Sequence, residues 1–419
     1  MIYNHQSPRA LSKPDQTISQ TRGRKCPLCK HNQRRPLFQH ELKDFDQHTC
    51  FQTIRIACCD NCGFIFNDTE ISPEELNIFY SQESQYLSNT SFGTGGINEG
   101  DMHRYETYLS ILSPYVTKDT KICDVGCAKG GLLKFLQNAG FHHVYGVEIN
   151  PKLVNLARSD GLNVQLGDAA YIPKFHDEPY ECLIFSHVFE HLLDFDSVLR
   201  SISESLVENG LVFIEVPNAT CYKDASPFDF YWFFATKEHV NHFSSRYLNL
   251  LMQSKGLECI DEIQYLMPYN NHDYYYPSLM MLFRKKQAVK LDGPEAFCRE
   301  LADHIQLYMD QERSRLEFHS NIINQLVYCQ TPIYCWGIGA EFLTVFSFTS
   351  IEQCNLVHLV DKNVQKQNLT FAGRPILPPD VLKTERNRAS VLIFSAFNNK
   401  AMKKYIEDIN YSGNIIVFD

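Results

Sequence analysis

Glycines between an apolar run and a helical pattern mark the stretch of this sequence with the clearest capacity for chemistry. Ile122 to Val125 is a short apolar run typical of a buried strand, and Leu132 to Leu136 has the spacing of a helix. The turn between them, Gly126-Cys-Ala-Lys-Gly130, lets part of a nucleotide approach the free N–H groups at the start of the helix. A second predicted strand, 144–148, ends in the carboxylate of Glu148. The pattern therefore predicts a nucleotide-binding site.

Four cysteines in two Cys-x-x-Cys pairs form a second candidate site. They are Cys26 and Cys29, followed by Cys59 and Cys62, with strand-like residues between the pairs. Two such turns can present four thiolates tetrahedrally to zinc, and an ion held by four protein ligands is structural rather than catalytic. The alternative is four unrelated thiols. The doubled spacing predicts a structural Zn²⁺ site.

Histidines gather after two of the predicted strands. His187 and His191 follow one strand, and Glu238 and His239 follow the next strand and an aromatic stretch. Because histidine titrates near neutrality, and because a carboxylate can orient it and raise its basicity, a Glu-His pair can act as a general base. The alternative is that these histidines cap helices or bond the backbone. We predict that the pair removes a proton from a substrate.

Length and composition limit the possible functions. The chain has 419 residues, a length that favours two or three domains. Its formal charge of −10 disfavours a nucleic-acid partner, which needs a basic surface. No apolar run is long enough to span a membrane, and the N-terminus lacks the apolar segment of a secretory signal. Many of the 15 cysteines lie in apolar runs and are expected to be reduced, so we predict a cytoplasmic protein.

Alternating strands and helices position the candidate residues. From residue 121 to about 284 the strands are predicted at 121–125, 144–148, 163–166, 181–186 and 211–216, with helices at 130–139, 151–159 and 195–207. This alternation predicts a parallel sheet, which two further strands near 257–266 and 278–283 complete as a hairpin-like edge. After a long helix or helical pair at 294–329, Pro332 to Ala340 repeats the strand–glycine turn–helix pattern.

These patterns divide the chain into six segments. The predicted segments are a mobile tail at 1–22, a zinc-binding module at 23–70, a helical connector with a substrate loop at 71–120, the nucleotide-binding domain at 121–290, a helical linker at 291–329 and a second Rossmann-like lobe at 330–419. The second glycine turn either binds its own nucleotide or packs the lobe and lines the substrate cleft. We favour packing, because Gly337-Ile-Gly-Ala-Glu lacks the third glycine of a dinucleotide site.

The first glycine turn resembles that of the S-adenosylmethionine (SAM) methyltransferases. Its form is Asp-x-Gly-x-(Gly/Ala)-x-Gly, with Ala128 in place of the usual middle glycine. The resemblance implies that the methionine part of SAM lies over the turn, that Glu148 binds the ribose hydroxyls and that Asp168 accepts from the adenine amine. The segment after the fourth strand resembles the residues that face the sulfonium in class I members. The implied SAM-binding residues are Asp124, Gly126, Cys127, Ala128, Gly130, Glu148, Asp168, Ser186 and His187.

The whole layout resembles bacterial nucleotide-sugar C-methyltransferases, which join a four-cysteine zinc module, a class I SAM methyltransferase core and a C-terminal Rossmann-like lobe. That is the α/β fold we expect. The resemblance implies methylation at carbon 3 of a 4-keto-deoxysugar on a nucleoside diphosphate, through an enolate formed by a base. It places the Glu-His pair on Glu238 and His239, with His239 as the base, and further substrate-facing residues on His191 and Tyr86. Thr236 stands where the family commonly has tyrosine.

Two other functions fit parts of the same pattern. One is methyl transfer to oxygen or nitrogen of a glycan or other small-molecule precursor, which needs less help from a base. The other is a non-catalytic protein that binds SAM or a nucleotide sugar. In every case the expected partner is a small molecule, and a monomer is compatible with the sequence.

Overall fold

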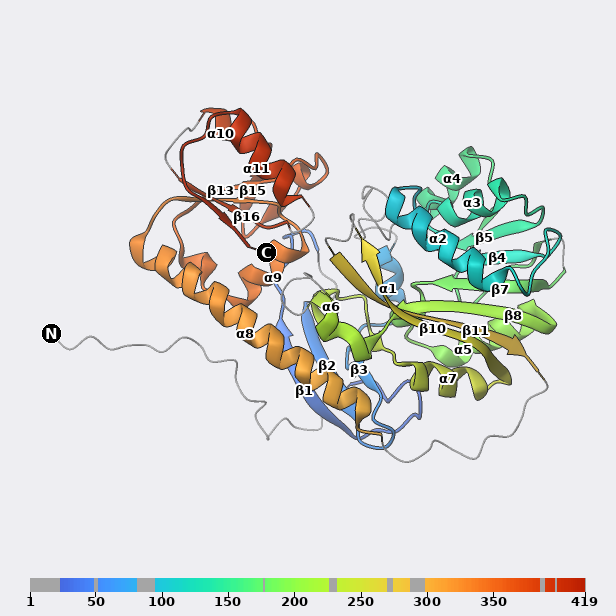
Figure 1. The fold of residues 1–419 in the computed structure, drawn as a ribbon. Coiled ribbons are helices and arrows are strands. Elements are labelled where there is room, and N and C mark those ends of the chain that lie inside the picture. Colours follow the sequence, from blue (N-terminus) through green and yellow to red (C-terminus); the bar gives the residue numbers. More distant parts are fainter. Residues whose placement is uncertain are drawn as a thin grey trace.

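The computed structural model describes residues 23–48, 52–80, 95–175, 178–225, 232–269, 274–286, 298–384, 389–395 and 398–418. Figure 1 shows a seven-stranded sheet on the right, a six-stranded sheet on the left and the N-terminal strands below and between them. No helix of the described part is long and apolar enough to cross a membrane.

The seven-stranded sheet has the order β10-β11-β8-β7-β4-β5-β6. Its five-stranded side is parallel, and β10 and β11 pair as an antiparallel hairpin at its edge. This confirms the predicted α/β sheet and its hairpin edge. The strands are β4 (Ile122–Val125), β5 (Val144–Glu148), β6 (Val164–Leu166), β7 (Tyr180–Ser186), β8 (Leu206–Pro217), β10 (Leu257–Tyr269) and β11 (Tyr274–Lys285).

One boundary differs from the prediction. The helix expected at 195–207 ends at Ser205, and β8 begins at once with Leu206 rather than at residue 211. Asn209 adopts a left-handed φ of 61° inside the strand, and the pairing of β7 with β8 shifts register between Tyr180 and Cys182. The Asn209-Gly210 pair therefore forms an irregularity within the strand instead of a turn before it.

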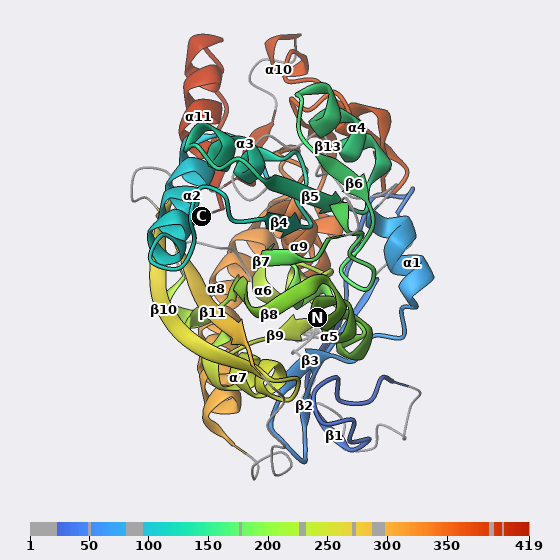
Figure 2. The same cartoon turned by 90° about the vertical axis from the view of Figure 1, so that its right-hand side faces the viewer.

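Helices cover both faces of this sheet. Figures 1 and 2 show α2, α3 and α4 on one side and α5 and α7 on the other. Their start signals are visible in the sequence: Pro151 opens α4, and the Asn150 side chain accepts from the N–H groups of Lys152 and Leu153. The helices are α2 (Glu99–Leu112), α3 (Gly131–Asn138), α4 (Pro151–Ser159), α5 (Phe195–Ser205) and α7 (Ser245–Gln253).

The N-terminal strands form a separate four-stranded sheet. β1 (Arg34–Glu41), β2 (Thr53–Cys59) and β3 (Ile65–Asn67) are antiparallel, and the fourth strand is β9 (Asn241–His242), from the middle of the chain. The sequence did not predict this pairing. After β3, Ser72 caps the short helix α1 (Pro73–Ile78) in a capping box with Glu75.

The C-terminal part begins with one helix of 30 residues, α8 (Glu300–Cys329). Figure 1 shows it extending from the six-stranded sheet to the N-terminal strands. The sheet has the order β14-β15-β13-β12-β16-β17, with α9 (Ala340–Phe348), α10 (Val381–Thr384) and α11 (Asn399–Asp408) around it. Its strands are β12 (Ile333–Trp336), β13 (Leu356–Val360), β14 (Thr370–Phe371), β15 (Arg374–Leu377), β16 (Ser390–Ile393) and β17 (Ile415–Val417).

The second glycine turn is held by a hydrogen bond to Asp361, a residue of the same lobe. Asp361 follows β13 and is buried; its Oδ2 accepts from the Ile338 N–H at 2.9 Å and from the Lys366 ammonium at 3.2 Å. Its Oδ1 accepts from the Asn363 N–H at 2.9 Å. The acid that would bind a ribose in a dinucleotide site thus holds the lobe's own backbone, which agrees with a packing role for this turn.

Candidate functional site

The first glycine turn adopts the backbone that its glycines permit. Gly126 and Gly130 have φ of 82° and 78°, and a Cβ on Gly126 would lie 2.8 Å from the Val188 side chain. Ala128 takes a left-handed φ of 47° although it has a Cβ, a conformation that costs about 1–2 kcal/mol. Ala128 therefore adopts a left-handed backbone conformation that a glycine would adopt at less cost.

The Glu148 carboxylate lies against this turn. Its Oε2 accepts from the Ala128 N–H at 2.9 Å, and its Oε1 accepts from the Asn150 N–H at 2.8 Å. Burial raises the pKa of Glu148 despite these bonds. Because a carboxylate has about four lone-pair sites, it can still accept from a ligand in the cavity that it lines.

The Asp124 carboxyl, at the end of β4, has an unsatisfied oxygen. Its Oδ1 is buried and has no hydrogen-bond partner among the described residues. Burial and, after it, the neighbouring Glu148 raise the pKa of Asp124 to about 7. A buried acceptor without a donor costs free energy, so the site favours a ligand that brings a positive charge or an N–H group to this oxygen.

One cavity of about 280 Å³ collects most of the predicted cofactor residues. At its far edge Asp168 accepts from the Tyr171 N–H at 2.8 Å through one oxygen. Gly130 is the exception: it does not line the cavity but precedes α3, where a Cβ would lie 2.4 Å from Leu162. The predicted residues that line the cavity are Asp124, Gly126, Cys127, Ala128, Glu148, Asp168, Ser186, His187 and His191.

Sequence reasoning missed a buried charge cluster beside the cavity. Glu215 of β8 has no exposed surface and contacts Arg104, Tyr108 and Ser278. Burial raises the pKa of Glu215, but Arg104 and then His187 outweigh this effect and lower it to about 2. A single acid inside the apolar run Leu211-Val-Phe-Ile-Glu-Val was the signal, because a buried charge requires a partner.

His187 lies between two carboxylates. Its Nδ1 is 2.9 Å from Glu190 Oε1, and its Nε2 is 3.4 Å from Glu215 Oε2. Burial lowers the pKa of His187, but Glu215 and Glu190 outweigh it and raise the value to about 9. The imidazole is therefore charged at neutral pH, and its backbone is fixed in a left-handed φ of 55°.

The carboxylate nearest to His191 is Glu190, not the predicted Glu238. The Glu238 backbone oxygen accepts from His191 Nδ1 at 3.1 Å, but no hydrogen bond joins the Glu238 side chain to His239 among the described residues. Instead Glu190 Oε1 lies 4.0 Å from His191 Nε2. Burial, and then His191 and His242, lower the pKa of His239. The prediction that Glu238 raises the basicity of His239 is wrong in this structure.

The His191 and His239 rings meet edge to face, with centroids 4.8 Å apart. His191 lines the cavity and His239 does not. Tyr80, two residues after α1, packs against His191 with ring centroids 5.9 Å apart. Tyr86, the predicted substrate-facing tyrosine, lies outside the described residues.

Glu190, His191 and His239 also have the residue types of a metal site. Their ligand atoms lie within 4.8 Å of one another. Tetrahedral ligands, each about 2.1 Å from one ion, would be about 3.4 Å apart. Glu190 Oε1 and His191 Nε2 are 4.0 Å apart, so these two side chains would have to move closer together to bind an ion in that geometry.

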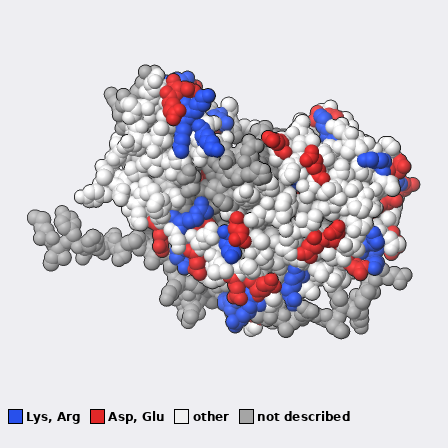
Figure 3. Space-filling view, in the orientation of Figure 1, with Lys and Arg blue, Asp and Glu red and all other residues white. Residues whose placement is uncertain are grey.

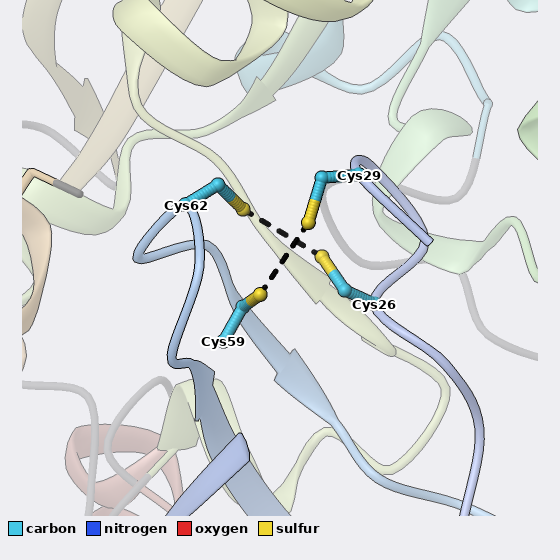
Figure 4. A group of neighbouring side chains, drawn as sticks. All are labelled: Cys26, Cys29, Cys59 and Cys62. Carbon is cyan, nitrogen blue, oxygen red and sulfur yellow. Dashed lines mark hydrogen bonds between the residues drawn. The ribbon is translucent and has the colours of Figure 1, made fainter. Parts of the chain in front are cut away.

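The four cysteines do converge. Figure 4 shows the Cys26–Cys29 turn facing the Cys59–Cys62 turn, with all four sulfurs directed to one centre. The Cys26 and Cys62 sulfurs are 3.7 Å apart, and those of Cys29 and Cys59 are 3.5 Å apart. Tetrahedral Zn–S bonds of about 2.3 Å place neighbouring sulfurs about 3.8 Å apart. The four thiols therefore fit a zinc ion.

Comparisons with known proteins match part of the chain. A family model described as "Methyltransferase domain" matches residues 98–262. The ubiquinone biosynthesis O-methyltransferase of Hydrogenovibrio crunogenus is 27% identical over 154 residues, which cover 35% of this chain and 61% of that protein. Protein arginine N-methyltransferase 1.1 of Arabidopsis thaliana is 32% identical over 139 residues, which cover 29% of this chain and 35% of that protein.

Among solved structures, magnesium protoporphyrin IX methyltransferase of Synechocystis PCC 6803 is 14% identical, with a TM-score of 0.38; the match covers 50% of this chain and 97% of that one. The chain spans between about a third and about three-fifths of the length of the curated relatives it matches. The parallel sheet with its antiparallel edge, the glycine turn with Glu148 and the family match together show that the chain carries a class I SAM-dependent methyltransferase domain.

Proposed function

We propose that the protein is a SAM-dependent methyltransferase that C-methylates a nucleotide-linked keto-deoxysugar. The observation that supports it most is a cavity where the glycine turn, two buried carboxylates and His191 face the same space. One side offers acceptors for a cationic nucleoside, and the other offers imidazoles. On the face drawn in Figure 3, basic and acidic side chains are intermingled rather than gathered into a basic surface.

The residues around the glycine turn fit SAM. Glu148 has lone pairs left for the two ribose hydroxyls, and the unpartnered Oδ1 of Asp124 suits the ammonium of the methionine part. Asp168, at the edge of the cavity, would accept from the adenine amine. When bound, SAM supplies an electrophilic methyl group. The protein's part is to bind and orient it and to keep water from the reacting carbon.

Glu148→Ala is expected to weaken binding of S-adenosylhomocysteine by about 10²-fold, because it removes two charge-assisted hydrogen bonds to the ribose. Calorimetry on the purified variant measures this directly, with circular dichroism to check the fold. Glu204→Ala, which removes an exposed carboxylate of α5, is the matched control and should bind as the natural protein does. Equal affinity in the Glu148 variant would contradict the assigned ribose site.

We further propose that His239 takes the proton from the carbon next to the acceptor carbonyl. The lowered pKa keeps its imidazole neutral at physiological pH, so a lone pair is available. The C–H electron pair would then pass into the carbonyl as an enolate, and the enolate carbon would take the methyl group of bound SAM, with S-adenosylhomocysteine as the other product. The residues of 330–419 would enclose the nucleotide of the acceptor.

Incubation with labelled SAM and a panel of nucleotide 4-keto-sugars, read by mass spectrometry, tests this function. A mass gain of one methyl group on a keto-sugar supports it, and NMR of the product locates the new methyl on carbon or on a heteroatom. The second candidate is transfer to oxygen or nitrogen, which is favoured by the similarity to an O- and an N-methyltransferase. A methyl on oxygen or nitrogen would select that candidate.

We propose that the four cysteines hold one structural zinc ion. Cys59→Ser is expected to lose about one equivalent of zinc and to lower the melting temperature, because the metal closes two turns into the common hydrophobic core. Metal analysis and thermal unfolding measure both effects. Cys58→Ser is the matched control, since Cys58 is equally buried but its thiol faces backbone oxygens. Zinc retained in the Cys59 variant would contradict the site.

A further inference from the structure

The four-cysteine module and the histidine site share a sheet. Phe66 of β3 pairs with Asn241 of β9, and the Asn67 N–H donates to the Val240 oxygen at 3.0 Å. β3 starts three residues after Cys62, and β9 starts two residues after His239. The segment that carries His239 therefore leads directly into an edge strand of the module's own sheet.

The Asn241 side chain extends this connection to His191. It is 1% exposed, and its Nδ2 donates to the backbone oxygens of Phe189 at 3.1 Å and Leu192 at 2.7 Å. These oxygens bracket the short 3₁₀ helix η3 (Phe189–His191), which ends at His191. One amide thus joins the segment of His239 to the segment of His191.

Arg24 holds the other end of the same amide. Its Nη2 donates to Asn241 Oδ1 at 2.6 Å and to the Val240 oxygen at 2.8 Å, and its guanidinium lies 5.3 Å from the centre of the Phe66 ring. Arg24 is two residues before Cys26, the first cysteine of the cluster. The four-cysteine turn therefore positions Arg24, and Arg24 fixes which way the Asn241 amide points.

We propose that Asn241 is a positioning residue for the proton-transfer site and that Arg24 anchors it to the four-cysteine module. With the amide oriented by Arg24, both N–H groups point at η3, and His191 is held against the Glu238 backbone and the His239 ring. The effect on turnover rests on the function proposed above. The effect on the two histidine rings does not depend on it.

Asn241→Asp is the sharpest test, because it keeps the shape and the oxygen that Arg24 binds but removes both N–H donors. We expect kcat to fall by about 10²-fold, as for a site displaced by about 1 Å, with KM for the acceptor changed only a few-fold. Affinity for S-adenosylhomocysteine should stay within about twofold, because neither Asn241 nor Arg24 lines the cofactor cavity.

The Arg24→Ala and Arg24→Lys variants distinguish loss of the contact between Arg24 and Asn241 from a general loss of folding. The alanine variant should lower kcat by about 10-fold, and lysine, which keeps one donor and the charge, should restore part of it. Arg55→Ala removes an arginine from β2 of the same sheet, where its side chain pairs with the exposed Glu70, and it should leave kcat unchanged. Zinc content should be the same in all variants.

A spectroscopic readout tests the proposal without any acceptor. The imidazole NMR signals of His191 and His239 should shift in the Asn241→Asp and Arg24→Ala variants and stay in place in Arg55→Ala. If no acceptor is turned over by the natural protein, the proposed function fails while these shifts still support the positioning role. If Asn241→Asp does not fold, the Arg24 pair gives the answer. Unchanged histidine signals in the Arg24→Ala variant would overturn the proposal.

Discussion

Glu215→Ala is expected to lower the free energy of unfolding by about 3–5 kcal/mol, the usual cost of removing one partner from a buried ion pair. Arg104 and His187 would lose the buried Glu215 carboxylate, although His187 would keep Glu190, and Ser278 would lose the acceptor that it meets at 2.6 Å. Chemical denaturation followed by circular dichroism measures the loss.

Glu208→Ala is the control for that variant. Glu208 lies on the same strand, but it is 69% exposed and pairs with Lys285 at the surface. Such surface pairs contribute about 0–1 kcal/mol, so the control should unfold almost as the natural protein does. A similar small effect for both variants would show that the buried cluster contributes little to stability.

The same cluster predicts how stability depends on pH. The pKa of Glu215 is lowered from 4.5 to about 2, so its contribution is complete above about pH 4.5 and is lost as the pH falls toward 2. The pKa of His187 is raised from 6.5 to about 9, so its contribution is complete below about pH 6.5 and is lost as the pH rises toward 9. In Glu215→Gln, the free energy of unfolding should fall less between pH 4.5 and 2 than in the natural protein. It should also fall less between pH 6.5 and 9.

The elements that carry the cofactor residues could be predicted because their signals are local. The apolar run of β4, the positive-φ positions around Gly126 and the terminal acid Glu148 lie within one strand–turn–helix–strand unit. Each residue type is dictated by its own neighbours: a glycine where the backbone is left-handed, an acid where free N–H groups converge. For the same reason the two cysteine turns were predicted as a pair.

The connections between distant segments could not be predicted. Asn241 pairs with Phe66 although most of the methyltransferase domain lies between them in the sequence. Nothing in either short strand specifies its partner. The Glu238–His239 prediction failed for a local reason. Adjacent side chains do not face each other, whereas Glu190 and His187, three apart along a turn, meet at 2.9 Å. Proximity in sequence was mistaken for contact.

His239→Asn is expected to lower kcat for C-methylation by about 10²- to 10⁴-fold, the range for losing a general base. Asparagine keeps a polar side chain of similar size but cannot take up a proton at neutral pH. Because the cavity that we assign to SAM is lined by other residues, affinity for S-adenosylhomocysteine should be unchanged. His103→Asn, on the exposed face of α2, is the control and should retain full turnover.

Exchange of the acceptor's C–H with solvent measures proton removal separately from methyl transfer, whereas kcat depends on both steps. In D₂O, with S-adenosylhomocysteine bound and no methyl donor, the base should exchange the acidic C–H of the acceptor for deuterium. The His239 variant should lose this exchange together with methyl transfer. Since His191 lies in the cavity wall with its ring 4.8 Å from His239, a His191→Asn variant that alone loses exchange would assign the proton transfer to His191. The neutral state that burial gives His239 would then keep a positive charge out of the contact between the two rings.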